Sequence, residues 1–511
     1  MIMDALLQDP ALPGAPHILL VSIPPPGHLF PFTSFAYQLA AAGAQVTCFT
    51  TGYVFEHLQH RGDNKYRDES SSGSCSKSSR VRFEGLFDYE EIHEIGMDDV
   101  MGWLQAFSNE KMEAVLERRF LELQPRPVCI VADMFLGWVQ DVANKMHVPR
   151  HTLFTMNAKE LAFLIRIPQL FESGELPGLN ADGVMKSDIS MPGMAPLPVE
   201  GVWGVFKDET VGHHQQVKEA FRRLSESKSI ILNTFEELEA ETLEALRTDY
   251  VAANIKVPEL LPILLSSIPR LQRPNATIGN DQVSEVEKWL DTQAPASVIY
   301  ISFGSLATLT KQQTGALALA LEATNYPFIW VYRPPGISQV SRQSKVSISA
   351  NHETSYEYFP PRFQDRVGGR AMLINGWAPQ PQILTHHAIG AFLTHCGWNS
   401  TLESVCAGVP MLCWPFFADQ NMNARFVTDT IQAGLRMKWG RSDDTVDQDE
   451  IQKVLTQMMD GEEGKAARSS ALKFRLLAQA DVADGGASNS NLHKILQECT
   501  SASLCNGSYG C

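Results

Sequence analysis

The sequence lacks the features that mark secreted, zinc-bound and membrane-spanning chains. Its 511 residues include nine cysteines, none in a CxxC pair or in a Cys/His spacing typical of zinc. This pattern argues against a disulfide framework and favours buried free thiols in a reducing compartment. No apolar run reaches the roughly 18 to 20 residues that a membrane span needs, so we expect no stable membrane insertion.

Basic residues are also scarce relative to acidic ones. The chain has 42 Lys and Arg against 58 Asp and Glu, a formal net charge of -16. Because such a surface repels phosphate backbones, we expect no nucleic-acid partner. The N-terminus carries Asp4 and Asp9 instead of a basic region, and its first apolar run is too short for a signal peptide. We therefore expect a cytoplasmic protein, and a monomer.

The length and the apolar pattern predict a two-domain α/β protein. Single hydrophobic cores stop growing near roughly 250 to 300 residues, so 511 residues favour two domains. Short apolar runs alternate with amphipathic segments, which is typical of parallel strands joined by helices. The runs are Ile18–Ile23, Gln45–Thr50, Val128–Ala132, Ser229–Thr234, Ser297–Phe303, Phe328–Tyr332, Ala371–Ile374, Ile389–Thr394 and Val409–Trp414.

Three polar stretches interrupt this alternation. Residues 62–80 and 334–358 are polar and show no periodicity, so we expect surface loops there. A third stretch, residues 257–280, is rich in proline and polar side chains, and we place the interdomain linker there.

The densest cluster of unusual residues lies between Trp377 and Gln420. Within it, a predicted strand ends at Thr394 and leads through a glycine-bearing turn into a helix that opens near Ser400. A helix N-terminus after such a turn presents backbone N–H groups and a positive dipole end, which can hold a diphosphate without a metal. An alternative interpretation is that Ser400-x-x-Glu403 is only a capping box.

The surroundings of that turn favour a binding site over a simple helix cap. Aromatic, acidic and amide side chains follow successive strands, at the edge where open α/β sheets bind ligands; they are Trp377, His395, Trp398, Glu403, Asp419 and Gln420. Asp447-Gln448-Asp449 could suggest a metal-binding DxD motif. Its position before an amphipathic run instead predicts a helix start, so we assign no metal.

The segment from Trp377 to Gln420 resembles the 44-residue signature box of the family 1 glycosyltransferases of plant secondary metabolism. The similarity extends to a PPPGH turn near the start, ILNTFEELE at Ile231–Glu239, an SFGS turn at Ser302–Ser305 and the GGASNSNL ending. It implies the GT-B fold, with two Rossmann-like domains facing across a cleft. The implied organisation is an acceptor-binding domain at 1–256, the linker at 257–280, a UDP-sugar-binding domain at 281–487, and a helix at 488–511 that crosses back to the first domain.

The resemblance also implies roles for the side chains of the box. It places Trp377 on the uracil, Gln380 beside the base, Glu403 on the ribose hydroxyls, His395, Asn399, Ser400 and Ser305 on the diphosphate, and Trp398, Asp419 and Gln420 on the sugar. These pairings are chemically reasonable, since an indole suits a flat base and a carboxylate suits a vicinal diol. The final glutamine is similar to that of glucose-using members, so the expected donor is UDP-glucose, with no further cofactor.

Transfer of a sugar to a hydroxyl needs a base, and His28 is the candidate. It follows the first predicted strand, and Asp133 follows the strand at Val128–Ala132. A carboxylate behind the imidazole would fix its tautomer. In the resembling family, such a histidine and the aspartate of a D-x-F segment form the catalytic dyad, here His28 and Asp133-Met134-Phe135. Taken singly, His28 could be a packed residue and Asp133 a helix cap.

The function that we expect is inverting transfer of glucose from UDP-glucose to a small lipophilic acceptor such as a flavonoid, phenolic or terpenoid. Two alternatives stay open: a UDP-sugar epimerase or hydrolase on the same fold, and a non-catalytic UDP-sugar-binding protein. Two features depart from the family pattern. The segment at 255–259 lacks the usual Gly-Pro, and the serine-rich loop at 62–80 is unusually long.

Overall fold

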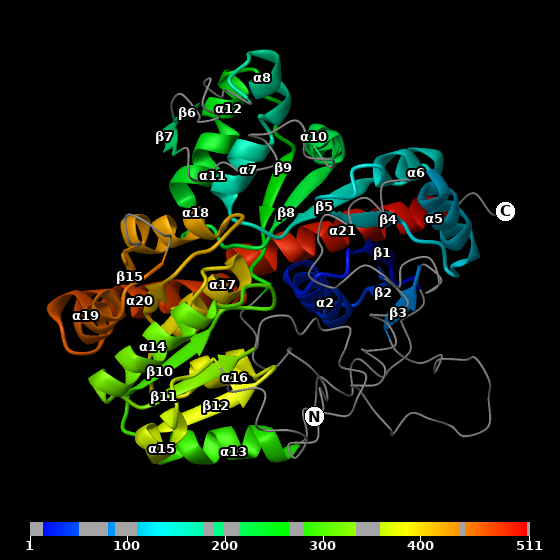
Figure 1. The fold of residues 1–511 in the computed structure, drawn as a ribbon. Coiled ribbons are helices and arrows are strands. Elements are labelled where there is room, and N and C mark those ends of the chain that lie inside the picture. The colour runs from blue at the N-terminus through cyan, green and yellow to red at the C-terminus, as the bar shows by residue number, and fades with distance from the viewer. Residues whose placement is uncertain are drawn as a thin grey trace, which may run out of the picture. The chain divides into compact units, whose positions relative to one another are not determined.

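The computed structural model describes residues 14–50, 80–86, 110–176, 188–198, 214–265, 280–333, 358–438 and 445–507. These form two compact units. The first contains the described residues up to Leu265 together with those from Ala480 onward, and the second runs from Asn280 to Gln479. Each unit is built on a parallel sheet flanked by helices (Figure 1). The predicted α/β class is therefore confirmed.

The first unit contains a seven-stranded sheet in the order β3-β2-β1-β4-β5-β8-β9. All of its neighbouring strands pair in parallel. The strands are β1 (His17–Val21), β2 (Gln45–Thr50), β3 (Val81–Gly85), β4 (Cys129–Asp133), β5 (Arg150–Phe154), β8 (Ser229–Leu232) and β9 (Glu259–Pro262). A separate antiparallel hairpin joins β6 (Ile189–Met191) to β7 (Met194–Leu197).

Helices of the first unit pack on this sheet because its strands are apolar on both faces. The helical segments of this unit are α2 (Pro26–Ala41), α5 (Glu110–Glu122), α6 (Val139–Lys145), α7 (Ala158–Leu164), α8 (Ile167–Glu172), α10 (His214–Arg222), the 3₁₀ turn η3 (Arg223–Glu226), α11 (Ala240–Arg247), α12 (Asp249–Ala252) and α21 (Ala487–Gly507). On one face, Phe32 and Phe35 of α2 and Ile495 of α21 share a core with alternate strand residues. The C-terminal helix thus belongs to the first unit's core.

The second unit contains a six-stranded parallel sheet in the order β12-β11-β10-β13-β14-β15. Its strands are β10 (Val298–Ser302), β11 (Phe328–Tyr332), β12 (Ala371–Asn375), β13 (Ile389–Thr394), β14 (Met411–Cys413) and β15 (Gly434–Arg436). Its helical segments are α13 (Asn280–Asp291), α14 (Lys311–Thr324), α15 (Phe363–Val367), the 3₁₀ turn η5 (Gly368–Arg370), α16 (Gln380–Thr385), α17 (Trp398–Ala407), α18 (Gln420–Arg425), the π-helical turn η6 (Phe426–Thr430) and α19 (Gln448–Met459). The long helix α20 (Glu462–Asp481) carries the chain into the first unit.

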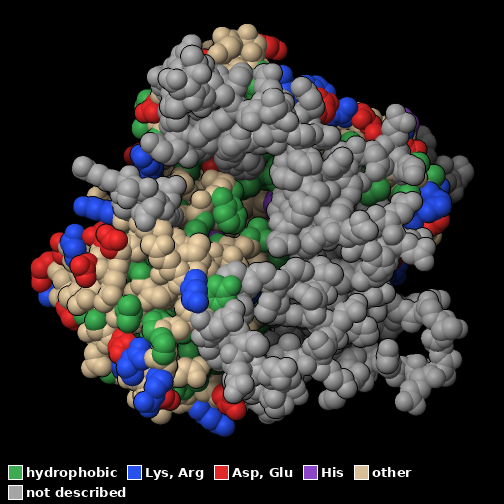
Figure 2. Space-filling view, viewed as in Figure 1, with side chains coloured by type: hydrophobic (Ala, Val, Ile, Leu, Met, Phe, Trp, Pro, Cys, Tyr) green, Lys and Arg blue, Asp and Glu red, His purple; other side chains and the backbone are tan. Residues whose placement is uncertain are grey.

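Amphipathic helices cover one face of the second sheet. Leu317 of α14, Phe363 of α15 and Ile451 of α19 pack with Trp330 and Leu393 of the strands in one buried cluster. On the outer side of α19 and α20, acidic and basic side chains lie interspersed (Figure 2). This division into a buried apolar face and a charged outer face is what an amphipathic helical period predicts.

In both sheets the chain order reverses in the middle of the sheet. The first sheet runs outward from β1 on one side and from β4 on the other, and the second does the same from β10 and β13. Loops that leave the carboxyl ends of these central strands diverge, and open α/β sheets bind ligands at such switch points. His28 and Asp133 belong to the first reversal, and Ser305 and His395 belong to the second.

The structure corrects the start of the predicted linker. Glu259–Pro262 forms β9, which pairs with β8 along four residues. Proline is tolerated there because it ends an edge strand, where no ladder donor is required. The linker residues 266–279 and the predicted surface loops lie outside the described residues, apart from Arg80 and Tyr358. The helix predicted at Asp447-Gln448-Asp449 is confirmed, since α19 begins at Gln448 with Asp447 as its N-cap.

Candidate active site

His28 and Asp133 meet at the switch point of the first sheet. Val21 of β1 pairs with Ala132 of β4, so the residues that follow these strands leave the sheet side by side. Pro26 opens α2, where its fixed backbone angle suits the first helical turn. This places His28 in the first turn, and its Nδ1 lies 2.8 Å from Oδ2 of Asp133. The structure therefore joins two residues that are 105 positions apart in the chain.

Neighbouring groups hold both partners of this pair. The backbone N–H of Phe135 donates to Oδ1 of Asp133 over 3.0 Å, so both carboxylate oxygens are engaged. The hydroxyl of Thr155, just after β5, lies 3.3 Å from His28 Nδ1. The Phe135 ring packs against the imidazole, with centroids 5.4 Å apart. Because His28 and Asp133 are buried, the carboxylate and the imidazole are fixed in one orientation, with Nε2 on the opposite side of the ring from Asp133.

The switch point of the second sheet holds the glycine-bearing turn. The helix α17 begins at Trp398 with Gly397 as its N-cap, so Ser400 is its third residue. The capping-box alternative for Ser400-x-x-Glu403 is therefore wrong, because Ser400 lies inside the helix. Trp398, Asn399 and Ser400 form the first turn, where backbone N–H groups point out of the helix N-terminus.

The imidazole of His395 fills the space between two glycines of this turn. A Cβ at Gly304 would lie 2.4 Å from His395 Nε2, and a Cβ at Gly397 would lie 2.5 Å from the same atom. Gly304 also has a φ of +74°, which side chains disfavour. The sequence requires glycine at both positions because the ring occupies the space that any side chain would need.

His395 is held in its neutral form. Burial, and to a lesser degree the nearby charge of Arg333, lowers the pKa of His395 to about 3. Arg333 donates hydrogen bonds to the carbonyl oxygens of Gly304 and Ser305 and so shapes the loop after β10. Within the described part of the chain, the buried Nδ1 of His395 has no hydrogen-bond partner. Such an atom in a native fold is a candidate for ligand binding.

A second polar group links α16 to α17. Nε2 of Gln380 donates to the hydroxyl of Ser400 over 2.9 Å and to Oε2 of Glu403 over 2.7 Å. Oε1 of Gln380 lies 3.3 Å from the hydroxyl of Tyr300, which comes from β10. Trp377 is half-buried on the loop between β12 and α16, three residues before Gln380. The structure thus brings Gln380, Ser400 and Glu403 together as one group.

Asp419 and Gln420 are buried at the start of α18 and point in fixed directions. Oε1 of Gln420 accepts hydrogen bonds from the backbone N–H groups of Phe416 and Phe417. This leaves the amide nitrogen of Gln420 as the donating end. Asn423 donates to Oδ2 of Asp419 over 2.7 Å and to the carbonyl oxygen of Cys396 over 2.9 Å. The side-chain amide of Asn423 therefore links Asp419 by hydrogen bonds to the turn that carries His395.

Sequence reasoning missed Asn423, Arg333 and Thr155. Asn423 lies three residues beyond the box and looks like an ordinary helical residue. Arg333 borders the predicted surface loop at 334–358, and Thr155 follows β5, which lies outside the predicted apolar runs. Only their positions in the chain could have indicated them. Arg333 and Thr155 each directly follow a strand, and Asn423 lies within one helical turn of the end of the box.

Two further observations concern membranes and metals. None of the helices in the described ranges is both long and apolar enough to cross a membrane. Among those same residues, no three His, Cys, Asp or Glu side chains gather into a group that could hold a metal ion.

Comparison with known proteins identifies the chain's relatives. Residues 234–466 match the family described as UDP-glucoronosyl and UDP-glucosyl transferase. UDP-glycosyltransferase 72B1 of Arabidopsis thaliana is 30% identical over 94% of this chain and 95% of its own length. The (R)-mandelonitrile beta-glucosyltransferase of Prunus dulcis is 30% identical over 94% of this chain and 97% of its own length.

A solved structure supports the same assignment. The Phytolacca americana UGT2, complexed with UDP-2fluoro-glucose and pterostilbene, matches with a TM-score of 0.74 and 27% identity, covering 95% of this chain and 99% of that one. The fold is therefore GT-B, with two Rossmann-like α/β domains. Because the similarity in sequence and fold spans nearly the whole length, the chain belongs to the plant-type family 1 UDP-glycosyltransferases and is an enzyme of that family.

Proposed function

We propose that this enzyme transfers glucose from UDP-glucose to a hydroxyl of a small lipophilic acceptor, with inversion at the anomeric carbon. The observation that carries the proposal is the buried pair of His28 and Asp133, 2.8 Å apart at the carboxyl edge of the first sheet. A hydroxyl is a weak nucleophile at neutral pH, so a positioned base is what the reaction requires of the protein.

In the proposed mechanism, His28 takes the acceptor proton at Nε2. Nδ1 faces Asp133, so the carboxylate favours the tautomer with the proton on Nδ1 and leaves Nε2 as the acceptor. As the proton arrives, the ring becomes cationic and Asp133 stabilises that charge. The deprotonated oxygen then attacks the anomeric carbon on the face opposite UDP, and an α-linked donor gives a β-glucoside.

The second unit is proposed to bind the donor. The N–H groups and the dipole of the first turn of α17 would bind the diphosphate. Asn399 and Ser400 lie in this turn, His395 precedes it, and Ser305 follows Gly304, which packs against His395. Such a site can stabilise the leaving group without a metal, so we propose metal-independent transfer. Trp377 would stack on the uracil, with Gln380 beside it and Glu403 on the ribose.

The proposed sugar is glucose. The amide nitrogen of Gln420 is free to act as the donating end because its oxygen accepts two backbone N–H groups, and the carboxylate of Asp419 is fixed by Asn423. Together with Trp398, they would offer one donor and one acceptor to neighbouring sugar hydroxyls. The name of the Prunus dulcis relative, a beta-glucosyltransferase, favours the same donor.

Release of UDP by the purified protein tests this function. UDP-glucose would be supplied with a panel of phenolic and terpenoid acceptors, and the products would be separated and their anomeric configuration measured by NMR. Acceptor-dependent release with a β-glucoside product is the expected result. Release without any acceptor would instead indicate a hydrolase, and conversion of UDP-glucose into another UDP-sugar without release of UDP would indicate an epimerase. Tight UDP-glucose binding without turnover would indicate a binding protein.

A further inference from the structure

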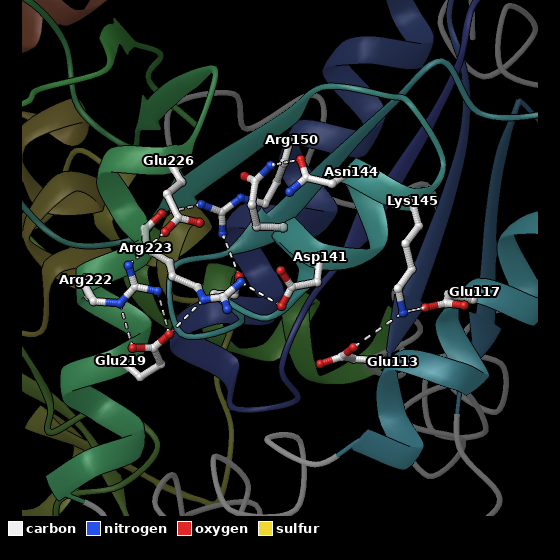
Figure 3. A network of polar contacts seen from close by, with 12 residues as sticks. Glu113, Glu117, Asp141, Asn144, Lys145, Arg150, Glu219, Arg222, Arg223 and Glu226 are labelled. Carbon is white, nitrogen blue, oxygen red and sulfur yellow. Dashed lines mark hydrogen bonds and ion pairs between the residues drawn. The ribbon is translucent and has the colours of Figure 1, made fainter.

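The short segment α10–η3 carries two adjacent arginines with different partners. Arg222 pairs with Glu219 at 2.8 Å and Glu226 at 3.0 Å, both on its own segment. Arg223 pairs with Glu219 at 2.9 Å and reaches across to Asp141 of α6 at 2.8 Å. Figure 3 shows Arg223 lying between these two carboxylates while Arg222 stays with its local partners. Of these two arginines, only Arg223 pairs with a carboxylate of another helix in the described part of the chain.

The buried guanidinium of Arg150 also binds this segment. The guanidinium of Arg150, on β5, donates to the carbonyl oxygen of Arg223 over 2.6 Å and to the hydroxyl of Ser227 over 2.8 Å. Burial lowers the pKa of Arg150 to about 10, so the group is still protonated at neutral pH. Burying a charged group is costly unless its hydrogen bonds are made. Moving the segment away from β5 would break the bonds of Arg150, so Arg150 holds the segment to the sheet.

The segment packs tightly on the loop that follows Asp133. A Cβ at Gly137 would lie 3.2 Å from the backbone of Ala220 and 3.2 Å from Cβ of Arg223. Next to this contact, the ring of Phe221 lies against the ring of Phe135, with centroids 5.6 Å apart. Both phenylalanines are buried, so close packing restricts the positions that each ring can take.

Phe135 links this contact to the catalytic pair. Its ring packs on His28 at 5.4 Å, and its N–H donates to Asp133. A shift of Phe221 would therefore pass to Phe135 and from there to both His28 and Asp133. The contacts form one continuous path from α10 to the imidazole.

We propose that Phe221 is a positioning residue for His28, and that the Arg223–Asp141 ion pair and Arg150 hold Phe221 in place. Phe221 sets the plane of the Phe135 ring, and Phe135 sets the plane of the imidazole. The inference rests on the proposed role of His28 as the base. It extends that function, because it gives the polar network of Arg150, Arg223 and Asp141 an effect on catalysis. This network reaches His28 only through the rings of Phe221 and Phe135.

The test uses the full-length protein and three variants: Phe221→Leu, Arg223→Met and the matched control Arg222→Met. The control removes an arginine that is 48% exposed with local partners, whereas Arg223 is 19% exposed and bridges two helices. All variants are first compared for thermal stability and for UDP affinity. The first readout is NMR of the side-chain nitrogens in protein labelled with ¹⁵N-histidine, where the His28 signals among 14 histidines are assigned by His28→Ala.

The expected result is a change in the His28 nitrogen shifts in Phe221→Leu and Arg223→Met, with no change in Arg222→Met. In turnover with UDP-glucose and a phenolic acceptor, kcat should fall about 10-fold in the same two variants while the KM for UDP-glucose stays constant, since small misplacements of a reacting group are costly. Asp141→Asn should add little to Arg223→Met, because both break the same pair, and Arg223→Lys should recover part of the loss.

Equal His28 signals and equal kcat in the Arg222 and Arg223 variants would overturn the inference, as would losses that only track thermal stability. The proposed function fails separately. If His28→Ala retains acceptor-dependent turnover, His28 is not the base, whatever the NMR spectra show. If His28→Ala is inactive but Phe221→Leu behaves like the control, only the positioning inference fails.

Discussion

Replacing Asp133 by asparagine should disable the base without removing any side-chain volume. In the native pair, Oδ1 accepts the N–H of Phe135 at 3.0 Å and Oδ2 faces His28 Nδ1 at 2.8 Å. Asparagine has only one oxygen, so it cannot accept from both donors. If its oxygen keeps the N–H of Phe135, its NH2 group faces Nδ1 and favours the tautomer with the proton on Nε2. That tautomer cannot take a proton from the acceptor.

The alternative rotamer does not restore the native arrangement. It would return an acceptor to His28 but would set the NH2 group against the N–H of Phe135, leaving a buried donor without an acceptor at a cost of about 1–3 kcal/mol. Because general base catalysis is typically worth about 10²–10⁴-fold, kcat for Asp133→Asn should fall within that range. The melting temperature should change little.

Steady-state kinetics with saturating UDP-glucose measure this loss, and isothermal titration with UDP serves as the control. UDP affinity should be unchanged, because Asp133 belongs to the first unit and the donor box to the second. The double variant with His28→Ala should be no slower than His28→Ala alone. A kcat for Asp133→Asn within about threefold of the wild type would show that Asp133 does not set the tautomer on which catalysis depends.

Two other variants test the donor unit and a buried carboxylate. Asn423→Leu should raise the KM for UDP-glucose and lower the free energy of unfolding by about 2–4 kcal/mol, since Asp419 and the carbonyl of Cys396 both lose a buried donor. Kinetics measure the KM and calorimetry measures the stability. Wild-type values for both would contradict this role of Asn423. Burial raises the pKa of Glu239 from 4.5 to about 7. The folded state therefore binds the proton more tightly, and this contribution to stability is lost as pH rises from about 4.5 to about 7, by at most about 3 kcal/mol. Glu239→Gln keeps an acceptor for the N–H of Ala158 and should flatten the dependence of the melting temperature on pH, whereas an unchanged slope would contradict this assignment.

Much of the fold was predictable because apolar runs bounded by turns report buried parallel strands directly. The pattern failed where a strand carries polar residues. Arg150 and His151 of β5 are buried, and their side chains bond to Ser227 and Ser229, which lie 77 and 78 residues further along the chain. Because these two residues are polar, β5 shows no apolar run. The bonds that allow their burial form only in the folded chain, so the buried strand could not be recognised from the sequence. The same strand leads to Thr155, which explains why that contact to His28 was missed.

The site was predictable to the extent that it follows strand ends. His28 and the turn at His395 both follow apolar runs, so their place at the carboxyl edge of a sheet could be inferred. The role of Ser400 could not, because a Ser-x-x-Glu pattern looks the same at a helix start and inside a helix. Gly397 is the N-cap instead, since its lack of a side chain makes room for His395. Asn423 needed the tertiary structure, because its two partners lie on different segments.

The role of His28 as the base is tested most directly by acceptor-dependent UDP release from the wild type and from His28→Ala, with UDP affinity measured on both proteins. We expect that the wild type forms a β-glucoside and that the variant binds UDP equally well but loses about 10²–10⁴-fold in turnover. A variant that keeps wild-type turnover would show that the proton leaves the acceptor by another route. In that case the pair of His28 and Asp133 would have a structural role only.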